Sequence, residues 1–154
     1  IVPAGGFRTP KSDLTKELLV DEDNNGRTPE DLYMDGMTIF NFAISYVHKD
    51  INSLIELMEW EKETVKLYAL HQANNFMVSY IRKKLKVEEE KVPVNVINYG
   101  NTGPATIPLL LSDIYSSKKA VLDRVVLSGF GVGLSWGSVA CNLEGTRFYE
   151  PLNK

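Results

Sequence analysis

Three short segments of the chain carry side chains and turns that could do chemistry on a carbonyl group. His71 begins the run His-Gln-Ala-Asn, Asn101 lies in Tyr-Gly-Asn-Thr, and Val132 lies between two glycines of a Gly-rich run. A histidine and an asparagine can donate hydrogen bonds to an oxygen that gains negative charge, and a tight turn can add a backbone N–H. Together these groups could bind and polarise a carbonyl. None of them is a nucleophile, so covalent acyl transfer would need one from elsewhere.

The three segments are expected at one edge of a sheet. Each follows a predicted strand, and these strands are expected to end at Leu70, Ile97 and Leu127. In α/β proteins, ligands and reacting groups collect at the carboxyl ends of strands. The sequence therefore predicts that His71 and Asn101 converge on one cleft.

Apolar periodicity predicts three helices and four strands. The helices are expected at Gly36–Trp60, Asn74–Leu85 and Gly103–Tyr115, and two strands at Val65–Leu70 and Val92–Ile97. A third strand is expected within Val121–Phe130 and a fourth within Leu134–Leu143. Their order predicts an α/β fold with a mixed sheet and with both buried and covering helices. The last two strands should form an antiparallel hairpin through the turn at Gly131 and Gly133.

The chain divides by pattern into three parts. Residues 1–35 are punctuated by proline and glycine and are expected to be irregular, residues 36–143 hold the predicted elements, and residues 144–154 form a tail without periodicity. Within the middle part, Ile39–Val47 and Ala105–Leu111 are apolar on all sides. Both helices should therefore be buried on more than one face, which implies a second layer beyond this sheet.

Composition narrows the class of protein. The net charge of −3 over 154 residues gives no reason to expect nucleic acid or an anionic membrane as a partner, and no apolar run reaches the roughly 20 residues that span a bilayer. The single cysteine, Cys141, excludes an intrachain disulfide and fits a reducing cytoplasm. It lies in a run that is typical of a buried strand, where a thiol acts as a small hydrophobe. His48 is expected on a helix surface, and no metal-binding spacing is present.

These segments resemble the C-terminal half of the β-ketoacyl-acyl carrier protein synthase III family, condensing enzymes of the thiolase superfamily. The similarity runs from about Met34 to Leu143, and begins with Met34–Ala43, which looks like the family's helix opening. The His-Gln-Ala-Asn, Gly-Asn-Thr and Phe-Gly-x-Gly-Leu-x-Trp-Gly segments occur in the family's order and spacing. The resemblance implies a thiolase-like half.

The resemblance also implies a reaction. The family's N-terminal half, which is missing here, supplies a nucleophilic cysteine that takes an acyl group from acyl-CoA. Malonyl-acyl carrier protein then loses carbon dioxide, and the carbanion attacks the thioester. His71 and Asn101 match the family's catalytic residues that hydrogen-bond the enolate oxygen, and Val132 matches the position whose backbone N–H lines the oxyanion hole. The acyl-CoA and malonyl-acyl carrier protein are substrates, and no cofactor is implied.

Further positions match the family's substrate and partner contacts. Ala73 and Asn74 match residues near the pantetheine arm, and Phe40 matches a residue beside the acyl channel, although a capping asparagine and a buried phenylalanine need no such role. Lys83 and Lys84 match basic residues that face the acyl carrier protein, although cations are also favoured at any helix C-terminus. The family implies a homodimer when the enzyme is intact.

The chain departs from the family at a few sites. Phe76 replaces an arginine five residues after the histidine, Gly103-Pro104 replaces a common Ser-Ala, and Met37 replaces a frequent asparagine.

Two other functions remain open at this point. One is a thiolase-superfamily acyltransferase that moves an acyl group without decarboxylation, with His71 as general base. The other is a non-catalytic partner subunit, which would need neither His71 nor Asn101.

Overall fold

The computed structural model describes residues 2–116 and 121–152, and its contacts divide the chain into two units, Ile1–Ile39 and Phe40–Lys154. Residue 1 of the predicted N-terminal segment and residues 153–154 of the predicted tail lie outside the described residues. Among the described residues, no helix has both the length and the apolar character needed to cross a membrane.

The first unit contains more structure than its sequence predicts. A single 3-10 turn, η1 (Leu14–Lys16), precedes a two-stranded antiparallel ribbon of β1 (Leu19–Val20) and β2 (Gly26–Arg27). The acidic segment between the strands is the turn, and its Asp21 Oδ1 accepts a hydrogen bond from the Asn25 backbone N–H at 2.9 Å. The expectation of an irregular segment is therefore wrong for this short ribbon, because a side chain that caps its own turn stabilises it locally.

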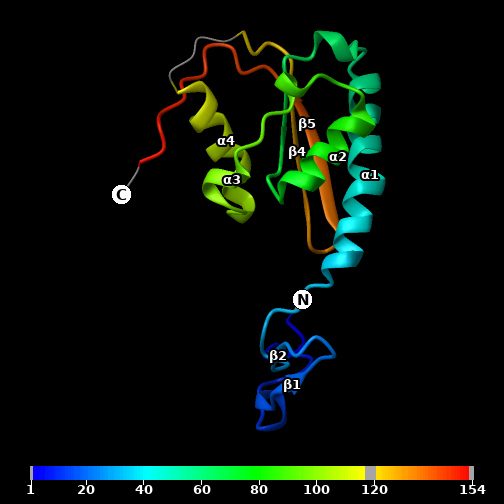
Figure 1. The fold of residues 1–154 in the computed structure, drawn as a ribbon, viewed down its shortest axis with the longest axis vertical. Coiled ribbons are helices and arrows are strands. Elements are labelled where there is room, and N and C mark those ends of the chain that lie inside the picture. Colours follow the sequence, from blue (N-terminus) through cyan, green and yellow to red (C-terminus); the bar gives the residue numbers. More distant parts are fainter. Residues whose placement is uncertain (1, 117–120, 153–154) are drawn as a thin grey trace. The chain divides into compact units, whose positions relative to one another are not determined.

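The second unit is built on a three-stranded mixed sheet (Figure 1). Its strands are β3 (Leu67–Leu70), β4 (Val125–Gly131) and β5 (Ser135–Cys141), in the order β3-β4-β5. Strand β3 pairs in parallel with β4, from Leu67↔Val125 to Leu70↔Ser128. Strand β5 returns antiparallel to β4, which confirms the predicted hairpin and the mixed sheet.

Helices cover both faces of this sheet. Helix α1 (Gly36–Leu57) and helix α2 (Asn75–Leu85) lie on one side of β4 and β5, and α3 (Val96–Tyr99) and α4 (Thr106–Tyr115) lie on the other (Figure 1). Short 3-10 turns, η2 (Lys62–Thr64), η3 (Glu89–Lys91) and η4 (Gly103–Ala105), fill the connections. The α/β fold with covering helices is therefore confirmed.

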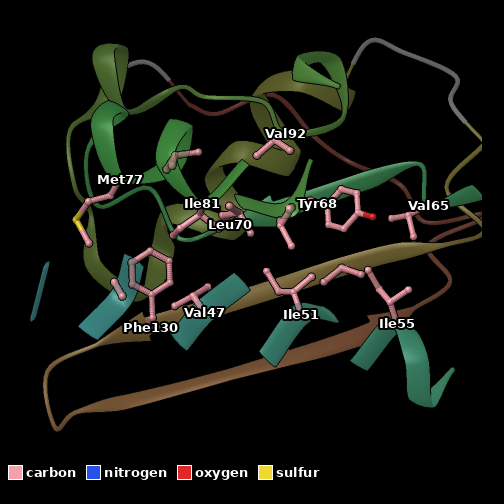
Figure 2. Close-up of a cluster of buried hydrophobic side chains, with 14 of the residues drawn as sticks. Val47, Ile51, Ile55, Val65, Tyr68, Leu70, Met77, Ile81, Val92 and Phe130 are labelled. Atoms are coloured by element: carbon pink, nitrogen blue, oxygen red, sulfur yellow. The ribbon is translucent and has the colours of Figure 1, made fainter. Parts of the chain in front are cut away.

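Strand β3 separates two apolar cores because successive side chains point to opposite faces. Tyr68 and Leu70 pack with α1 and α2 in the larger cluster, which Figure 2 shows against the helix positions Val47, Ile51 and Ile55. Leu67 and Ala69, the alternate residues, pack with α4 in the second cluster. All four residues of β3 are buried, so the strand that leads to His71 is held from both sides.

The predicted strand Val92–Ile97 does not exist. Val92 ends a 3-10 turn, Pro93 lacks the N–H that a strand ladder needs, and the backbone then turns into α3. The Asn95 N–H bonds the Gln72 side chain at 3.1 Å, not a neighbouring strand. The β-rich composition of the run is therefore overridden by Pro93 and by the polar contacts of Asn95.

The hairpin strands differ from their prediction in extent and in burial. Strand β4 begins at Val125, inside the predicted range, and runs to Gly131, past the predicted end at Leu127. The run that includes β5 is not a buried strand, since Trp136 is 48% and Val139 is 58% exposed. Helix α1 covers only part of Trp136, whose ring lies 5.0 Å from that of Phe42. An apolar sequence predicts burial of a strand but does not show how far the covering helices extend over it.

Candidate active site

His71 lies immediately beyond the carboxyl end of β3. Its backbone N–H bonds the Ser128 carbonyl at 2.8 Å, which continues the ladder to β4 by one residue. Its ring is half-buried and meets the edge of the Phe130 ring with centroids 5.2 Å apart. Burial lowers the pKa of His71, because removing water disfavours the charged imidazolium. The site thus presents a fixed, neutral imidazole at neutral pH.

Gln72 fastens the following loop to the end of this strand. Its side chain is buried, and Nε2 donates to the Leu70 carbonyl at 2.9 Å while Oε1 accepts from the Asn95 N–H at 3.1 Å. Asn95 in turn donates through Nδ2 to Asp113 Oδ2 on α4 at 3.2 Å. Gln72 belongs to the His-Gln-Ala-Asn run, and the one signal of this role in the sequence is its place next to a buried strand, where a buried amide needs hydrogen-bond partners.

Asn101 lies in the loop between α3 and α4. Gly100 before it has a φ of +69°, a conformation that favours glycine. The Asn101 Oδ1 accepts a hydrogen bond from the Gly103 N–H at 3.0 Å, which closes a tight turn. The Asn101 side chain is exposed, and its Nδ2 donates to no residue of the described chain. The side-chain oxygen of Asn101 therefore stabilises the turn, and its side-chain NH2 group is free to donate to a ligand.

Thr106, the first residue of α4, links this loop to His71. Its Oγ1 lies 2.6 Å from His71 Nδ1 and 3.0 Å from the Gly103 carbonyl oxygen. On the other side of the loop, the Tyr99 hydroxyl donates to Asp113 Oδ1 at 2.8 Å, a bond that raises the pKa of Tyr99. The structure thus brings the Asn101 loop against His71 through Thr106, a residue to which the sequence pattern gives no role.

Val132 lies in the turn between β4 and β5, as predicted, and its side chain is exposed. Phe130, the next-to-last residue of β4, contacts His71, so the turn follows two residues after that contact. Gly133 has a φ of +140°, and a Cβ there would lie 2.2 Å from Ser135 Oγ. The turn therefore requires glycine at that position.

The three predicted substrate-binding residues lie around the start of α2. The Ala73 N–H bonds the His71 carbonyl at 3.1 Å. Asn74 is the N-cap of α2, and its Oδ1 accepts from the Met77 N–H at 2.8 Å. Phe40 is partly buried, and its ring stacks on that of Phe76 at 5.8 Å. Capping accounts for Asn74 without a ligand, because an asparagine satisfies an otherwise free N–H there.

The two lysines of the predicted docking site lie in the last turn of α2 and are exposed. Lys84 lies over the Tyr80 ring, with Nζ 5.5 Å from its centroid. Their neighbour Arg82 forms an ion pair with Glu89 at 3.3 Å. Lys83 forms no ion pair within the described chain, so its charge faces solvent.

Cys141 lies far from His71 along the sheet. It pairs with Val125 at the start of β4, whereas Trp136 pairs with Phe130, which contacts His71. Five residues of strand separate Trp136 from Cys141, a distance of about 17 Å at the usual rise. Burial also raises the pKa of the Cys141 thiol, which disfavours the reactive thiolate. Cys141 therefore cannot serve as a nucleophile beside His71.

His48 differs from its prediction. It is only partly exposed and its Nδ1 is buried, so it is less accessible than the expected surface position. Burial is the main cause that lowers the pKa of His48. Its helix packs against α2, which the pattern of its own helix could not show. No group of three or more His, Cys, Asp or Glu side chains suited to a metal ion occurs within residues 2–116 and 121–152.

Comparison with known proteins gives a consistent result. Residues 55–143 match the family described as 3-Oxoacyl-[acyl-carrier-protein (ACP)] synthase III C terminal. A Beta-ketoacyl-[acyl-carrier-protein] synthase III of Streptococcus agalactiae serotype III (strain NEM316) is 46% identical over 111 residues, which are 70% of this chain and 34% of that protein. A putative 3-oxoacyl-[acyl-carrier-protein] synthase 3 of Campylobacter jejuni is 32% identical over 145 residues, 94% of this chain and 40% of the relative.

Solved structures are similar over nearly the whole chain. A 3-oxoacyl-(acyl-carrier-protein) synthase III crystal structure superposes with a TM-score of 0.86 at 38% identity, covering 92% of this chain and 42% of that one. A 3-oxoacyl-(acyl-carrier protein) synthase from Burkholderia xenovorans LB400 gives a TM-score of 0.80 at 37% identity, covering 97% and 41%. The thiolase-like fold is therefore confirmed. The chain spans about a third to two fifths of the length of these relatives.

Proposed function

The chain belongs to the 3-oxoacyl-(acyl-carrier-protein) synthase III family, and from this premise we propose that it carries the part of the active site that activates a malonyl thioester. The observation that carries the proposal is the contact of His71, at the end of β3, with the loop that holds Asn101. Both side chains can donate hydrogen bonds, and the amide of Asn101 is free to do so.

The proposed reaction is a decarboxylative condensation. The malonyl carboxylate leaves as carbon dioxide, and the electron pair of the broken C–C bond moves into the thioester, whose carbonyl oxygen becomes an enolate. His71 Nε2–H and Asn101 Nδ2–H donate to that oxygen, each such donor being worth about 3–4 kcal/mol in comparable sites. The enolate carbon then attacks an acyl thioester, and the thiolate leaves.

The nucleophile of this reaction must come from outside the chain. Cys141 is the one cysteine of the sequence, and it lies at the wrong end of the hairpin with a raised pKa. We propose that an N-terminal half, of the kind that the greater length of the relatives would accommodate, supplies a cysteine that accepts the acyl group from acyl-CoA. The chain alone would then be inactive in condensation.

A second function is favoured by one observation. The lowered pKa of His71 leaves the imidazole neutral, which would also suit a general base in transfer of an acyl group to a hydroxyl or amine. The two functions differ in carbon balance. Condensation releases one carbon dioxide for each acyl group consumed, and simple acyl transfer releases none.

The test measures carbon dioxide from carboxyl-labelled malonyl-acyl carrier protein, with the full-length protein that contains this chain and an acyl-CoA. We expect release in a one-to-one ratio to product. Asn101→Asp is the matched variant, because it keeps the oxygen that accepts from Gly103 but removes the amide donor. It should lower release by about 10²-fold, whereas Asn98→Ala, an exposed residue of α3, should not. Product formed without carbon dioxide would establish the acyltransferase instead.

Other residues are assigned roles on the same premise. We propose that the Val132 backbone N–H lines the oxyanion hole for the acyl thioester, that Ala73 and Asn74 lie along the pantetheine arm, and that Phe40 borders the acyl channel. Ala73 and Asn74 follow the carboxyl end of β3, Val132 follows the strand that contacts His71, and the Phe40 ring stacks on that of Phe76 in α2. A cytoplasmic location and a homodimeric intact enzyme complete the proposal.

The partner that would deliver malonyl groups is an acyl carrier protein, and we propose that Lys83 and Lys84 contact its acidic surface. Both are exposed at the end of the helix that begins beside His71. Reversing both charges to Glu should weaken carrier binding about tenfold at low salt and less at high salt, because exposed charges are screened. Lys66→Glu, an exposed lysine at the amino end of β3, is the control. Equal affinity for wild-type and charge-reversed protein at low salt would exclude this docking site.

A further inference from the structure

The Thr106 hydroxyl lies between two acceptors and has one proton to share. Thr106 is 2% exposed, and its Oγ1 lies 2.6 Å from His71 Nδ1 and 3.0 Å from the Gly103 carbonyl oxygen. If the proton points at Gly103, then His71 must carry its own proton on Nδ1 and donate to Thr106. If the proton points at His71, then Nδ1 is the acceptor and the ring proton is on Nε2.

The other partners of these atoms decide between the two arrangements. The Gly103 carbonyl already accepts a hydrogen bond from the Thr106 backbone N–H, so it is satisfied without the hydroxyl. His71 Nδ1 contacts no other hydrogen-bonding group in residues 2–116 and 121–152. The 2.6 Å separation of Thr106 Oγ1 and His71 Nδ1 is shorter than the roughly 2.7–3.2 Å typical of an N–H donor and suits a hydroxyl donor, whereas the 3.0 Å from Oγ1 to the Gly103 oxygen is at the long limit for a hydroxyl donor. The hydroxyl proton therefore belongs to His71.

We infer that Thr106 is a positioning residue that holds His71 as the tautomer with its proton on Nε2. This inference rests on the proposed function for its consequence, because only that tautomer can donate a hydrogen bond from Nε2 to the enolate oxygen. The alternative tautomer would direct a lone pair at the oxygen and repel it. The ring is also fixed in orientation, since the Phe130 edge contact and the Thr106 bond hold two of its sides.

The first test reads the tautomer directly and needs no activity. Nitrogen-15 NMR of the 154-residue chain, above the pKa of His71, should show a protonated Nε2 and an Nδ1 that accepts a hydrogen bond. In Thr106→Val the His71 Nδ1 resonance should move toward that of an unbonded imine nitrogen, and in Thr106→Ser it should stay. A wild-type ring protonated on Nδ1 would overturn the inference.

The second test reads the consequence in the full-length protein. Thr106→Val should lower kcat for condensation roughly tenfold or more, up to the about 10²–10³-fold that loss of a whole oxyanion donor costs, with acylation by acyl-CoA and the KM for malonyl-carrier protein little changed. Thr106→Ser should restore kcat. Loss in both variants alike would overturn the inference, since it would assign the effect to packing and not to the hydroxyl.

The two proposals fail separately. If the wild-type tautomer is as expected but no carbon dioxide is released, the proposed reaction is wrong and the Thr106 assignment stands. If carbon dioxide is released but the ring is protonated on Nδ1, the reaction stands and the Thr106 assignment is wrong. Should Thr106→Val fail to fold, the wild-type and Thr106→Ser spectra still decide.

Discussion

Strand β3 pairs in parallel with β4, has all four residues buried and ends at His71, whereas β5 pairs antiparallel on the other side of β4 and leaves Trp136 and Val139 half-exposed. Both strands are apolar in sequence. The difference arises because α1, α2 and α4 pack over β3 from both faces, and reach only part of β5. The β3 side of the sheet is covered on both faces and supports the candidate site, whereas the β5 side leaves apolar side chains that no described residue fully covers.

This difference assigns separate tasks to the two strands. The β3 side supplies the rigidity that places His71 against Thr106 and Phe130. The β5 side supplies the Val132 turn and an exposed strand, a surface of the type that usually meets another protein surface. Changes on the two sides should therefore differ in kind, with stability and chemistry affected on the β3 side and association on the β5 side.

The largest contrast in unfolding free energy should come from replacing one side chain of each strand by alanine. Leu70→Ala removes a fully buried side chain of the larger core and should cost about 2–5 kcal/mol of unfolding free energy. Val139→Ala removes an exposed side chain and should cost under about 0.5 kcal/mol. Urea unfolding of both variants makes the comparison, and equal losses would show that the two strands are equally buried in solution.

The hairpin turn offers a smaller contrast within the β5 side. Gly133→Ala should cost about 1–3 kcal/mol, because φ is +140° and the new Cβ would meet Ser135 Oγ at 2.2 Å. Gly131→Ala is the control, since a Cβ there meets nothing within 4 Å. Thermal unfolding would measure both. A tolerated alanine at Gly133 would mean that the turn differs in solution and that the Val132 N–H has no fixed direction.

The exposed side of the sheet should also make the isolated chain associate. Sedimentation velocity over a range of concentrations should show species larger than a monomer, because Trp136, Val139 and Tyr46 leave apolar surface uncovered. Val139→Lys, a change at an exposed position, should weaken this association several-fold, whereas Lys66→Glu should not. If the chain stays monomeric at every concentration and binds no hydrophobic dye, the apolar side chains of the β5 side are covered in solution and this prediction is wrong.

The smallest effect is a pH dependence located on the β3 side. Burial lowers the pKa of His71, so the folded protein takes up its proton less readily than the unfolded chain. Stability is then full above the ordinary histidine pKa of about 6.5 and falls as the pH drops through the lowered value. His71→Gln should reduce the loss of unfolding free energy between pH 7.5 and 5.5. His48 also titrates with a lowered pKa, so His48→Gln gives the comparison. An unchanged pH dependence in His71→Gln would show that the ring is solvated.

The predictions succeeded where residue type and local pattern decide the outcome. His71 follows a buried strand in sequence, and the glycines mark the hairpin, so both could be placed without coordinates. The strand expected before Asn101 was wrong, because Pro93 and the Gln72–Asn95 contact override a β-rich composition. The loop still reaches His71, by a different route.

Two features could not be read from the sequence for a physical reason. The role of Thr106 depends on a 2.6 Å contact across 35 residues of chain, and a hydroxyl residue by itself carries no such signal. The exposure of β5 depends on how far α1 extends over the sheet. The sequence of an apolar strand is the same whether or not a helix packs over it. Tertiary contacts decide both.

The central claim is that His71 stabilises the malonyl-derived enolate and does not activate the acyl-accepting thiol. The most direct measurement compares His71→Ala with wild type in the full-length protein, with acylation by labelled acyl-CoA and condensation with malonyl-acyl carrier protein followed separately. If His71 stabilises the enolate, His71→Ala should acylate at a near-normal rate and lose condensation by about 10²–10³-fold, with His48→Ala retaining both. Acylation reduced to the same degree as condensation, or condensation within a few-fold of wild type, would contradict it.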